Sequence, residues 1–139
     1  VPGVAHAGQV LDCAGNPHRD VKSGGDDFSG LADLVDPDHA LTDEVRLVPT
    51  PGHTPGHVSV LIASQGEEAV ITGDLVHHPV ELLAPEWTMI ADVDPAQAVA
   101  SRRAFVDRFG DSETLVLGTH FGGSSAGRLD ASARTWTPA

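Results

Sequence analysis

The chain has 139 residues, and its 8 Lys and Arg stand against 20 Asp and Glu, so its formal net charge is −12. This charge argues against nucleic acid and anionic membrane surfaces as partners, because both recruit clustered cations. The length suits one domain, and 40% hydrophobic with 20% charged residues is typical of a soluble globular protein. We therefore expect a folded domain that binds neither nucleic acid nor membrane.

Cysteine content and hydropathy narrow the class further. Cys13 is the only cysteine, which excludes an intrachain disulfide and any metal site that needs two thiolates. No apolar run approaches the about 18 residues of a spanning helix, and residues 1–10 lack the pattern of a signal peptide. We expect a cytoplasmic protein.

The pattern along the chain predicts a loop-like start followed by a domain. Residues 1–30 hold six of the 15 glycines and show no sustained periodicity, so we predict a poorly structured, Gly-rich segment there and the domain over residues 31–139. Apolar alternation and runs predict four short strands, at residues 45–48, 57–63, 69–72 and 115–117. A helix is predicted from Asp94 as N-cap, through Pro95, to a stop at Gly110. This order of strands and helix predicts an α/β or α+β fold.

Histidines are frequent in this sequence, and His53 is the first candidate metal ligand among the eight. His53 and His57 are four residues apart, but Pro55 and Gly56 lie between them, so the two side chains cannot share a helix face. A rigid Pro-Gly turn can hold the His53 imidazole at a fixed angle, which favours a metal ligand. The alternative is a histidine that only hydrogen-bonds a turn carbonyl.

Asp74 and His120 each follow an apolar predicted strand. The carboxylate of Asp74 would lie at the C-terminal edge of the sheet, where α/β sites usually form, and a carboxylate can bridge two divalent ions. The alternatives are a capping or turn aspartate and a strand-end histidine with ordinary hydrogen bonds. Together the three residues favour a metal site.

These segments carry a family resemblance. Residues 50–59 (TPGHTPGHVS), 71–74 (ITGD) and 115–120 (LVLGTH) resemble, in order and spacing, the later metal motifs of the metallo-β-lactamase superfamily. The stretch DLVHHP at residues 74–79 is similar to the lactonase-like and organophosphate-hydrolase-like branches. The resemblance implies the C-terminal half of an αββα sandwich, in which mixed β-sheets pack face to face with helices outside.

The resemblance also implies a site and a reaction. His53 would bind one zinc ion, His120 a second, and Asp74 would bridge them and orient the attacking water. His57 would support these ligands, and His77 and His78 would line the substrate pocket or support the ligands, although a purely structural role is equally open. The implied reaction is hydrolysis of a small-molecule lactone, ester or phosphotriester by a metal-activated water.

One departure from the family pattern concerns the cluster H-x-H-x-D-H, which should precede His53. No two of the eight histidines are two residues apart, so the cluster is absent. Each metal would have one histidine and a shared Asp74, which predicts weak or partial zinc binding. Two hypotheses stay open: an incomplete chain of a hydrolase, and a non-catalytic remnant or interaction module.

Half of a sandwich leaves one face of its sheet uncovered. This exposed face predicts a homo-oligomer, or a missing N-terminal half as the partner.

Overall fold

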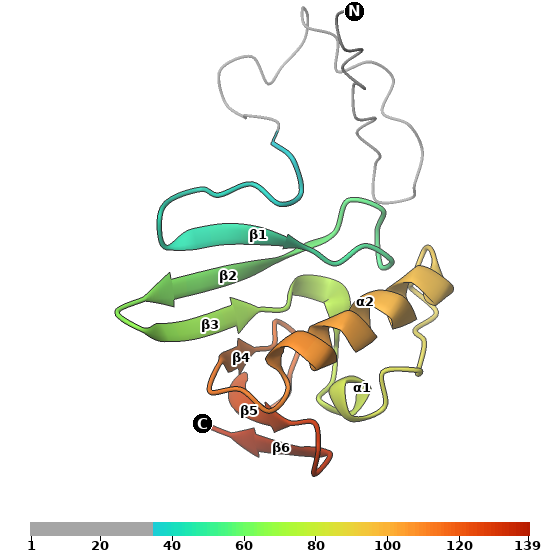
Figure 1. Cartoon of the computed structure of the whole chain (residues 1–139). Coiled ribbons are helices and arrows are strands. Elements are labelled where there is room, and N and C mark those ends of the chain that lie inside the picture. Colours follow the sequence, from blue (N-terminus) through green and yellow to red (C-terminus); the bar gives the residue numbers. More distant parts are fainter. Residues whose placement is uncertain (1–34) are drawn as a thin grey trace, which may run out of the picture.

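The computed structural model describes residues 35–139 (Figure 1). The predicted Gly-rich segment over residues 1–30 and the predicted start of the domain at residue 31 lie outside the described residues. No helix within residues 35–139 combines the length and the apolar character that crossing a membrane requires.

Six strands form one mixed sheet in the order β1-β2-β3-β4-β5-β6 (Figure 1). Their bounds are β1 Val45–Pro49, β2 Val58–Ser64, β3 Glu67–Ile71, β4 Leu115–Leu117, β5 Ala126–Asp130 and β6 Thr135–Pro138. Strands β3 and β4 are parallel, and every other neighbouring pair is antiparallel. A parallel pair needs a long crossover connection, and the helices found within residues 35–139 lie in that connection. The predicted α/β class with a mixed sheet is confirmed.

The crossover contains a short 3₁₀ turn, η1 (Gly73–Leu75), a one-turn helix, α1 (Val80–Leu83), and the long helix α2 (Pro95–Phe109). Helix α2 begins and ends as its sequence predicts: the Asp94 side chain accepts a hydrogen bond from the Gln97 backbone N–H at 3.0 Å, and the helix ends before Gly110. Helix α1 was not predicted, because four residues are too few to show helical periodicity.

The strand boundaries differ slightly from the prediction at β3. This strand begins at Glu67 because Gln65 and Gly66 both have positive φ and form a tight turn that pairs Glu67 with Ser64. It ends at Ile71, and Thr72 caps η1 instead of extending the strand. Strands β5 and β6 were not predicted, since Gly127 and Arg128 interrupt the apolar pattern of β5.

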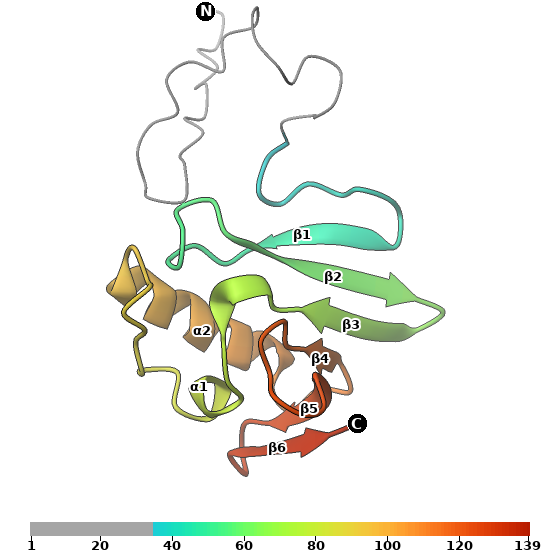
Figure 2. The same cartoon turned by 180° about the vertical axis from the view of Figure 1, so that it is seen from behind.

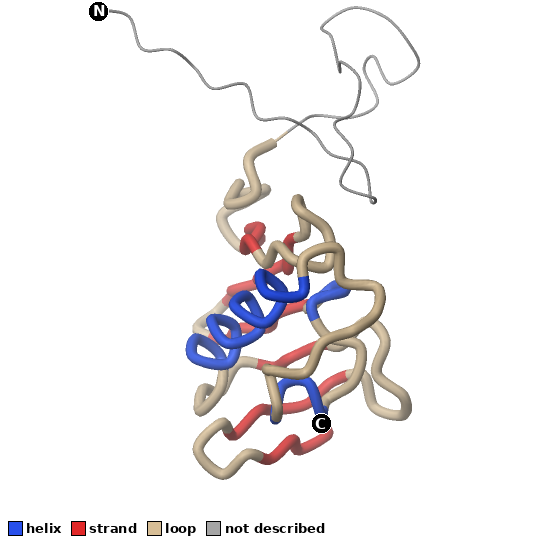
Figure 3. Tube along the Cα trace, turned by 90° about the vertical axis from the view of Figure 1, so that its right-hand side faces the viewer, coloured by secondary structure: helices blue, strands red, loops and turns tan. Residues whose placement is uncertain are grey.

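Helix α2 lies across one face of the sheet, as the views from opposite sides show (Figures 1 and 2). Seen from the side, the helix runs as the long blue coil beside the red strands (Figure 3). The core between them contains Phe105 and Phe109 from the helix and Leu61, Val70 and Val116 from the central strands. Alternate strand residues face away from this core and are only partly buried. A second sheet is absent from residues 35–139.

The register of the central strands determines where the site forms. Val60 of β2 pairs with Ile71 of β3, which pairs with Leu117 of β4. Since β2 is antiparallel to β3 and β4 is parallel to it, the start of β2 and the ends of β3 and β4 lie at one end of the sheet. Residues just before β2 and just after β3 and β4 therefore come together.

Candidate functional site

The loop between β1 and β2 carries His53 and is attached to the start of α2. Gly52 has φ +137°, and a Cβ atom at this position would lie 2.3 Å from the Cα atom of Ala98. Only glycine therefore allows the loop to approach the helix this closely. The carbonyls of Gly52 and His53 accept hydrogen bonds from the backbone N–H groups of Asp94 (2.9 Å) and Val93 (3.2 Å).

His57 uses both of its ring nitrogens in hydrogen bonds. Its Nδ1 atom donates toward the Thr50 carbonyl (3.1 Å) and lies 2.8 Å from the Thr50 hydroxyl, while its Nε2 atom accepts from the backbone N–H of Asp74 at 2.8 Å. Burial lowers the pKa of His57, although its bond to Thr50 acts in the opposite direction. The neutral ring suits this pattern, and it leaves no nitrogen free for a metal.

Asp74 and His120 are in direct contact at the ends of β3 and β4. The Nε2 atom of His120 donates to Asp74 Oδ1 at 2.7 Å. This hydrogen bond is the main reason why the pKa of Asp74 is lowered. Both atoms of this hydrogen bond could ligate a cation, and a metal could bind His120 Nε2 only after the proton has left that nitrogen.

Two further histidines complete the cluster. The Nε2 atom of His53 lies 3.6 Å from Asp74 Oδ2. The ring of His77 stacks on that of His120 with centroids 4.6 Å apart, and lies 5.3 Å from the ring of His53. One potential ligand atom from each of Asp74, His77 and His120 falls within 4.8 Å of the others. His77 is thus nearer to a ligand position than sequence reasoning expected.

His78 lies outside this cluster. The backbone of His77, which belongs to the cluster, is held by the side chain of Glu81. His78 is exposed, and its Nδ1 atom accepts from the backbone N–H of Val80 at 3.1 Å. Buried Glu81 accepts from the backbone N–H groups of His77 (2.5 Å) and His78 (3.2 Å). Burial lowers the pKa of His77, and the nearby His120 acts in the same direction.

Asp92 and Arg102 form a buried pair behind His53 that sequence reasoning missed. Each side chain is only 1% exposed, and their closest N–O distance is 3.4 Å. Arg102 lies on the face of α2 that also buries Ala98, Phe105 and Phe109. The sequence did contain a signal for this pair: Arg102 occupies a position of the helical repeat whose other members are apolar, which predicts a buried arginine. A buried cation requires an anionic partner.

The residues present fit a divalent metal ion. Three imidazoles and one carboxylate gather at one end of the sheet, and nitrogen and oxygen donors of these types are those that zinc takes in proteins. The Nδ1 atom of His77 is buried and has no hydrogen-bond partner among the described residues, as expected of a donor atom in an incomplete site.

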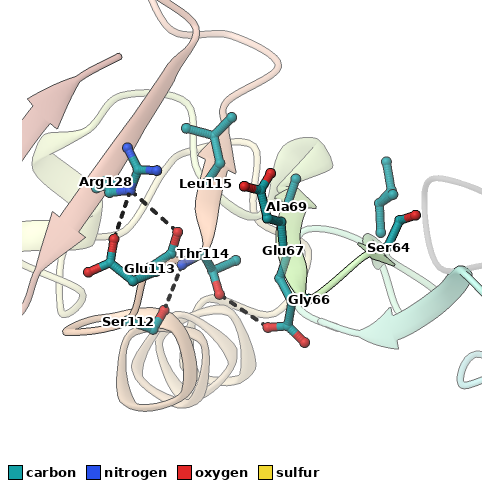
Figure 4. A pocket seen from close by; sticks show the side chains of 11 residues that line it. Ser64, Gly66, Glu67, Ala69, Ser112, Glu113, Thr114, Leu115 and Arg128 are labelled. Atoms are coloured by element: carbon teal, nitrogen blue, oxygen red, sulfur yellow. Dashed lines mark hydrogen bonds and ion pairs between the residues drawn. The ribbon is translucent and has the colours of Figure 1, made fainter.

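A hollow lies at the opposite end of the sheet (Figure 4). Its volume is about 690 Å³, and residues from the end of β2 and the starts of β3 and β4 line it. Its polar contacts include the Thr114 hydroxyl donating to Glu68 at 3.2 Å and Arg128 donating to the Glu113 carbonyl at 3.3 Å. No histidine lines it, so it is separate from the cluster.

Comparison with known proteins identifies related folds. The family model described as the metallo-beta-lactamase superfamily matches residues 3–120. No curated protein matches the chain. Among solved structures, the chain is similar to AidC, a dizinc quorum-quenching lactonase in complex with a product, with 26% identity, a TM-score of 0.69 and coverage of 77% of this chain and 37% of that one.

Two other structures extend this comparison. The hydrolase AbOPH of the beta lactamase superfamily is 29% identical with a TM-score of 0.63, covering 70% of this chain and 35% of that one. A probable metal-dependent hydrolase from Staphylococcus aureus shares the fold at 22% identity with a TM-score of 0.70, covering 81% of this chain and 42% of that one. The chain therefore spans less than half the length of these relatives.

Proposed function

The chain belongs to the metallo-beta-lactamase superfamily, and from this we propose that it supplies part of the active site of a zinc-dependent hydrolase. The observation that carries the proposal is the convergence of His53, Asp74 and His120 from three separate segments at one end of the sheet. Clusters of ionisable groups with a perturbed pKa are found preferentially at functional sites, and the pKa of Asp74 is lowered by its hydrogen bond to His120.

In this proposal His53 would hold one divalent ion, His120 would hold a second, and Asp74 would contribute its carboxylate to both. A bound divalent ion supplies Lewis-acid chemistry, since it lowers the pKa of water and polarises a carbonyl or phosphoryl oxygen. The chain's own residues position this chemistry: His57 fixes the backbone of Asp74, and Glu81 fixes the backbone of His77. His77 stacks on the ring of His120 beside the ligands and would contact the substrate or support the ligands.

The proposed substrate class is a lactone, another ester or a phosphotriester. The similarity to a lactonase structure makes a lactone the first candidate. All three substrates are hydrolysed by attack of water on a polarised carbon or phosphorus centre, so one site can serve each of them.

The number of metal ligands in this chain determines the zinc affinity that we expect. His53, Asp74 and His120 give each ion one imidazole and a shared carboxylate, fewer than the three protein ligands of a usual catalytic zinc. We therefore propose weak or partial zinc binding, strengthened by a second copy of the chain or by a separate N-terminal half. The rival hypothesis is a non-catalytic remnant or interaction module that retains the C-terminal half of the fold.

Zinc binding and hydrolysis by the whole chain test the proposal. Zinc affinity is measured by competition with a chromogenic chelator, and turnover with a simple γ-lactone, an aryl ester and an aryl phosphotriester. His53→Gln, Asp74→Asn and His120→Gln are each expected to weaken zinc binding by at least about tenfold. His39→Gln is the matched control, because His39 is exposed and lies outside the cluster.

The outcomes separate the two hypotheses. Zinc binding that depends on the three residues, together with hydrolysis that a chelator abolishes, supports the hydrolase. A folded chain that binds no zinc and hydrolyses none of the substrates supports the remnant. Zinc binding that the three variants leave unchanged would place the metal elsewhere and overturn the site.

A further inference from the structure

Asp92 is a buried carboxylate close to the Nδ1 atom of His53, and one of its two oxygens has no hydrogen-bond partner among residues 35–139. Its Oδ2 atom lies 3.4 Å and 3.5 Å from the two terminal nitrogens of Arg102 and accepts from the backbone N–H of Met89 at 3.2 Å. Its Oδ1 atom is buried and has no hydrogen-bond partner among the described residues. A buried charged oxygen without a partner is costly, so a donor for it is expected nearby.

The nearest donor is the imidazole of His53. Asp92 Oδ1 lies 3.5 Å from His53 Nδ1, and this nitrogen is also buried and unpartnered within the described part of the chain. Two buried polar atoms without hydrogen-bond partners thus lie 3.5 Å apart, and each has the chemistry that the other requires. The other ring nitrogen, Nε2, faces Asp74 at 3.6 Å.

The backbone holds the two side chains in this relation. The carbonyl of His53 accepts from the backbone N–H of Val93, the residue after Asp92. Arg102 fixes the other side of the carboxylate, and its guanidinium also donates to the carbonyls of Leu75 (3.2 Å), Pro85 (3.3 Å) and Trp87 (2.6 Å). The carboxylate therefore cannot turn away from His53 without breaking a buried ion pair.

We propose that Asp92, held by Arg102, is a positioning residue that keeps the proton of His53 on Nδ1 and leaves Nε2 as the metal-binding atom. An ionised carboxylate only accepts hydrogen bonds, so the His53 nitrogen beside it must be the donor. Asp74 competes for the proton from the other side, but it is 43% exposed and already accepts from His120, whereas Asp92 is buried and unsatisfied. Outer carboxylates of this kind orient metal-binding histidines in general.

This inference rests on the proposed role of His53, and its test separates the two. The tautomer of His53 is read from a long-range proton–nitrogen correlation spectrum of the whole metal-free chain at about pH 9, where free imidazole is neutral. The His53 signals are assigned by their loss in His53→Gln. We expect a protonated Nδ1 and a bare Nε2. A protonated Nε2 overturns the inference, whether or not zinc binds.

A pair of variants then tests the role of Asp92. Asp92→Asn removes the anionic acceptor and is expected to increase the Nε2-protonated form and to weaken zinc binding by about tenfold. Asp94→Asn removes an equal charge two residues away but keeps the helix cap, and is expected to leave the tautomer unchanged. Equal tautomer populations in the wild type and a folded Asp92→Asn chain overturn the inference. If Asp92→Asn does not fold, the wild-type tautomer decides.

Failure of the proposed function gives a different pattern. A chain that binds no zinc but carries the expected His53 tautomer, shifted by Asp92→Asn, contradicts the metal site and supports the pairing of Asp92 with His53. A chain that binds zinc through His53 with the opposite tautomer supports the metal site and contradicts the role of Asp92.

Discussion

The Nε2 atom of His57 accepts a hydrogen bond from the backbone N–H of Asp74 at 2.8 Å, although the residues are 17 positions apart. The bond belongs to a longer network. The Thr50 hydroxyl lies 2.8 Å from His57 Nδ1 and 3.2 Å from the Ser59 hydroxyl, and Ser59 donates to the Thr72 carbonyl at 3.0 Å. The network joins the loop before β2 to the turn after β3, and it holds the main chain of Asp74 in place.

Replacing His57 tests this network. His57→Ala leaves the Asp74 N–H and the Thr50 carbonyl without their partner, so we expect the free energy of unfolding to fall by about 1–3 kcal/mol. Urea denaturation of the two chains measures the difference. His39→Ala, at an exposed histidine, is the control and is expected to change little. An equal loss in both variants would contradict the role of the network.

Gly73 gives a second test of the same contact. It has φ +57°, and a Cβ atom there would lie 2.7 Å from His57 Nε2. Gly66 also has positive φ (+86°), but its Cβ position has no atom within 4 Å. Both alanine variants carry left-handed strain of about 1–2 kcal/mol, and only Gly73→Ala adds a clash. We expect Gly73→Ala to lower the urea midpoint further, and the reverse order would contradict the assigned contact.

The buried guanidinium of Arg102 predicts a large effect on stability. Arg102→Met removes a cation that is 1% exposed and leaves Asp92 buried without it, and we expect a loss of about 3–5 kcal/mol. Arg103→Met is the matched control, since the neighbouring Arg103 is exposed on the same helix. Thermal and urea unfolding measure both variants. Similar stabilities for the two would show that the buried pair does not stabilise the fold.

The hydrogen bonds of Asp111 are expected to make the free energy of unfolding depend on pH in acid. It accepts hydrogen bonds from the backbone N–H (2.9 Å) and the hydroxyl (2.7 Å) of Ser132, which hold its pKa below the ordinary value of 3.8. Because the folded-state pKa is lowered, this stabilisation is present above pH 3.8 and is lost as the pH falls through the lower value.

Urea midpoints measured at decreasing pH test this dependence. Asp111→Asn is expected to be less stable than the wild type at neutral pH, and the difference is expected to shrink in acid. Ser132→Ala, which removes only the hydroxyl donor, is expected to give a smaller change in the same direction. Curves for the wild type and Asp111→Asn that stay parallel throughout would contradict the prediction.

Local patterns in the sequence determined much of the fold. Apolar alternation predicts β1 and β2, and the cap, proline and stop residues predict α2, because these signals depend on neighbours along the chain. The motifs around His53, Asp74 and His120 likewise identify the family, since their order and spacing are properties of the sequence itself. The short elements β5, β6 and α1 gave too few residues for a periodic signal.

Only the tertiary structure decided how the side chains behind the site are arranged. The pairing of Asp92 with Arg102, its approach to His53 and the position of His77 on the ring of His120 depend on the crossover that brings α2 against the loop before β2. The same holds for the bond between His57 and Asp74, which forms because β2 and β3 are antiparallel neighbours. These contacts depend on how separate elements pack, so periodicity can indicate that Arg102 is buried but cannot identify its partner or the neighbours of His53 and His77.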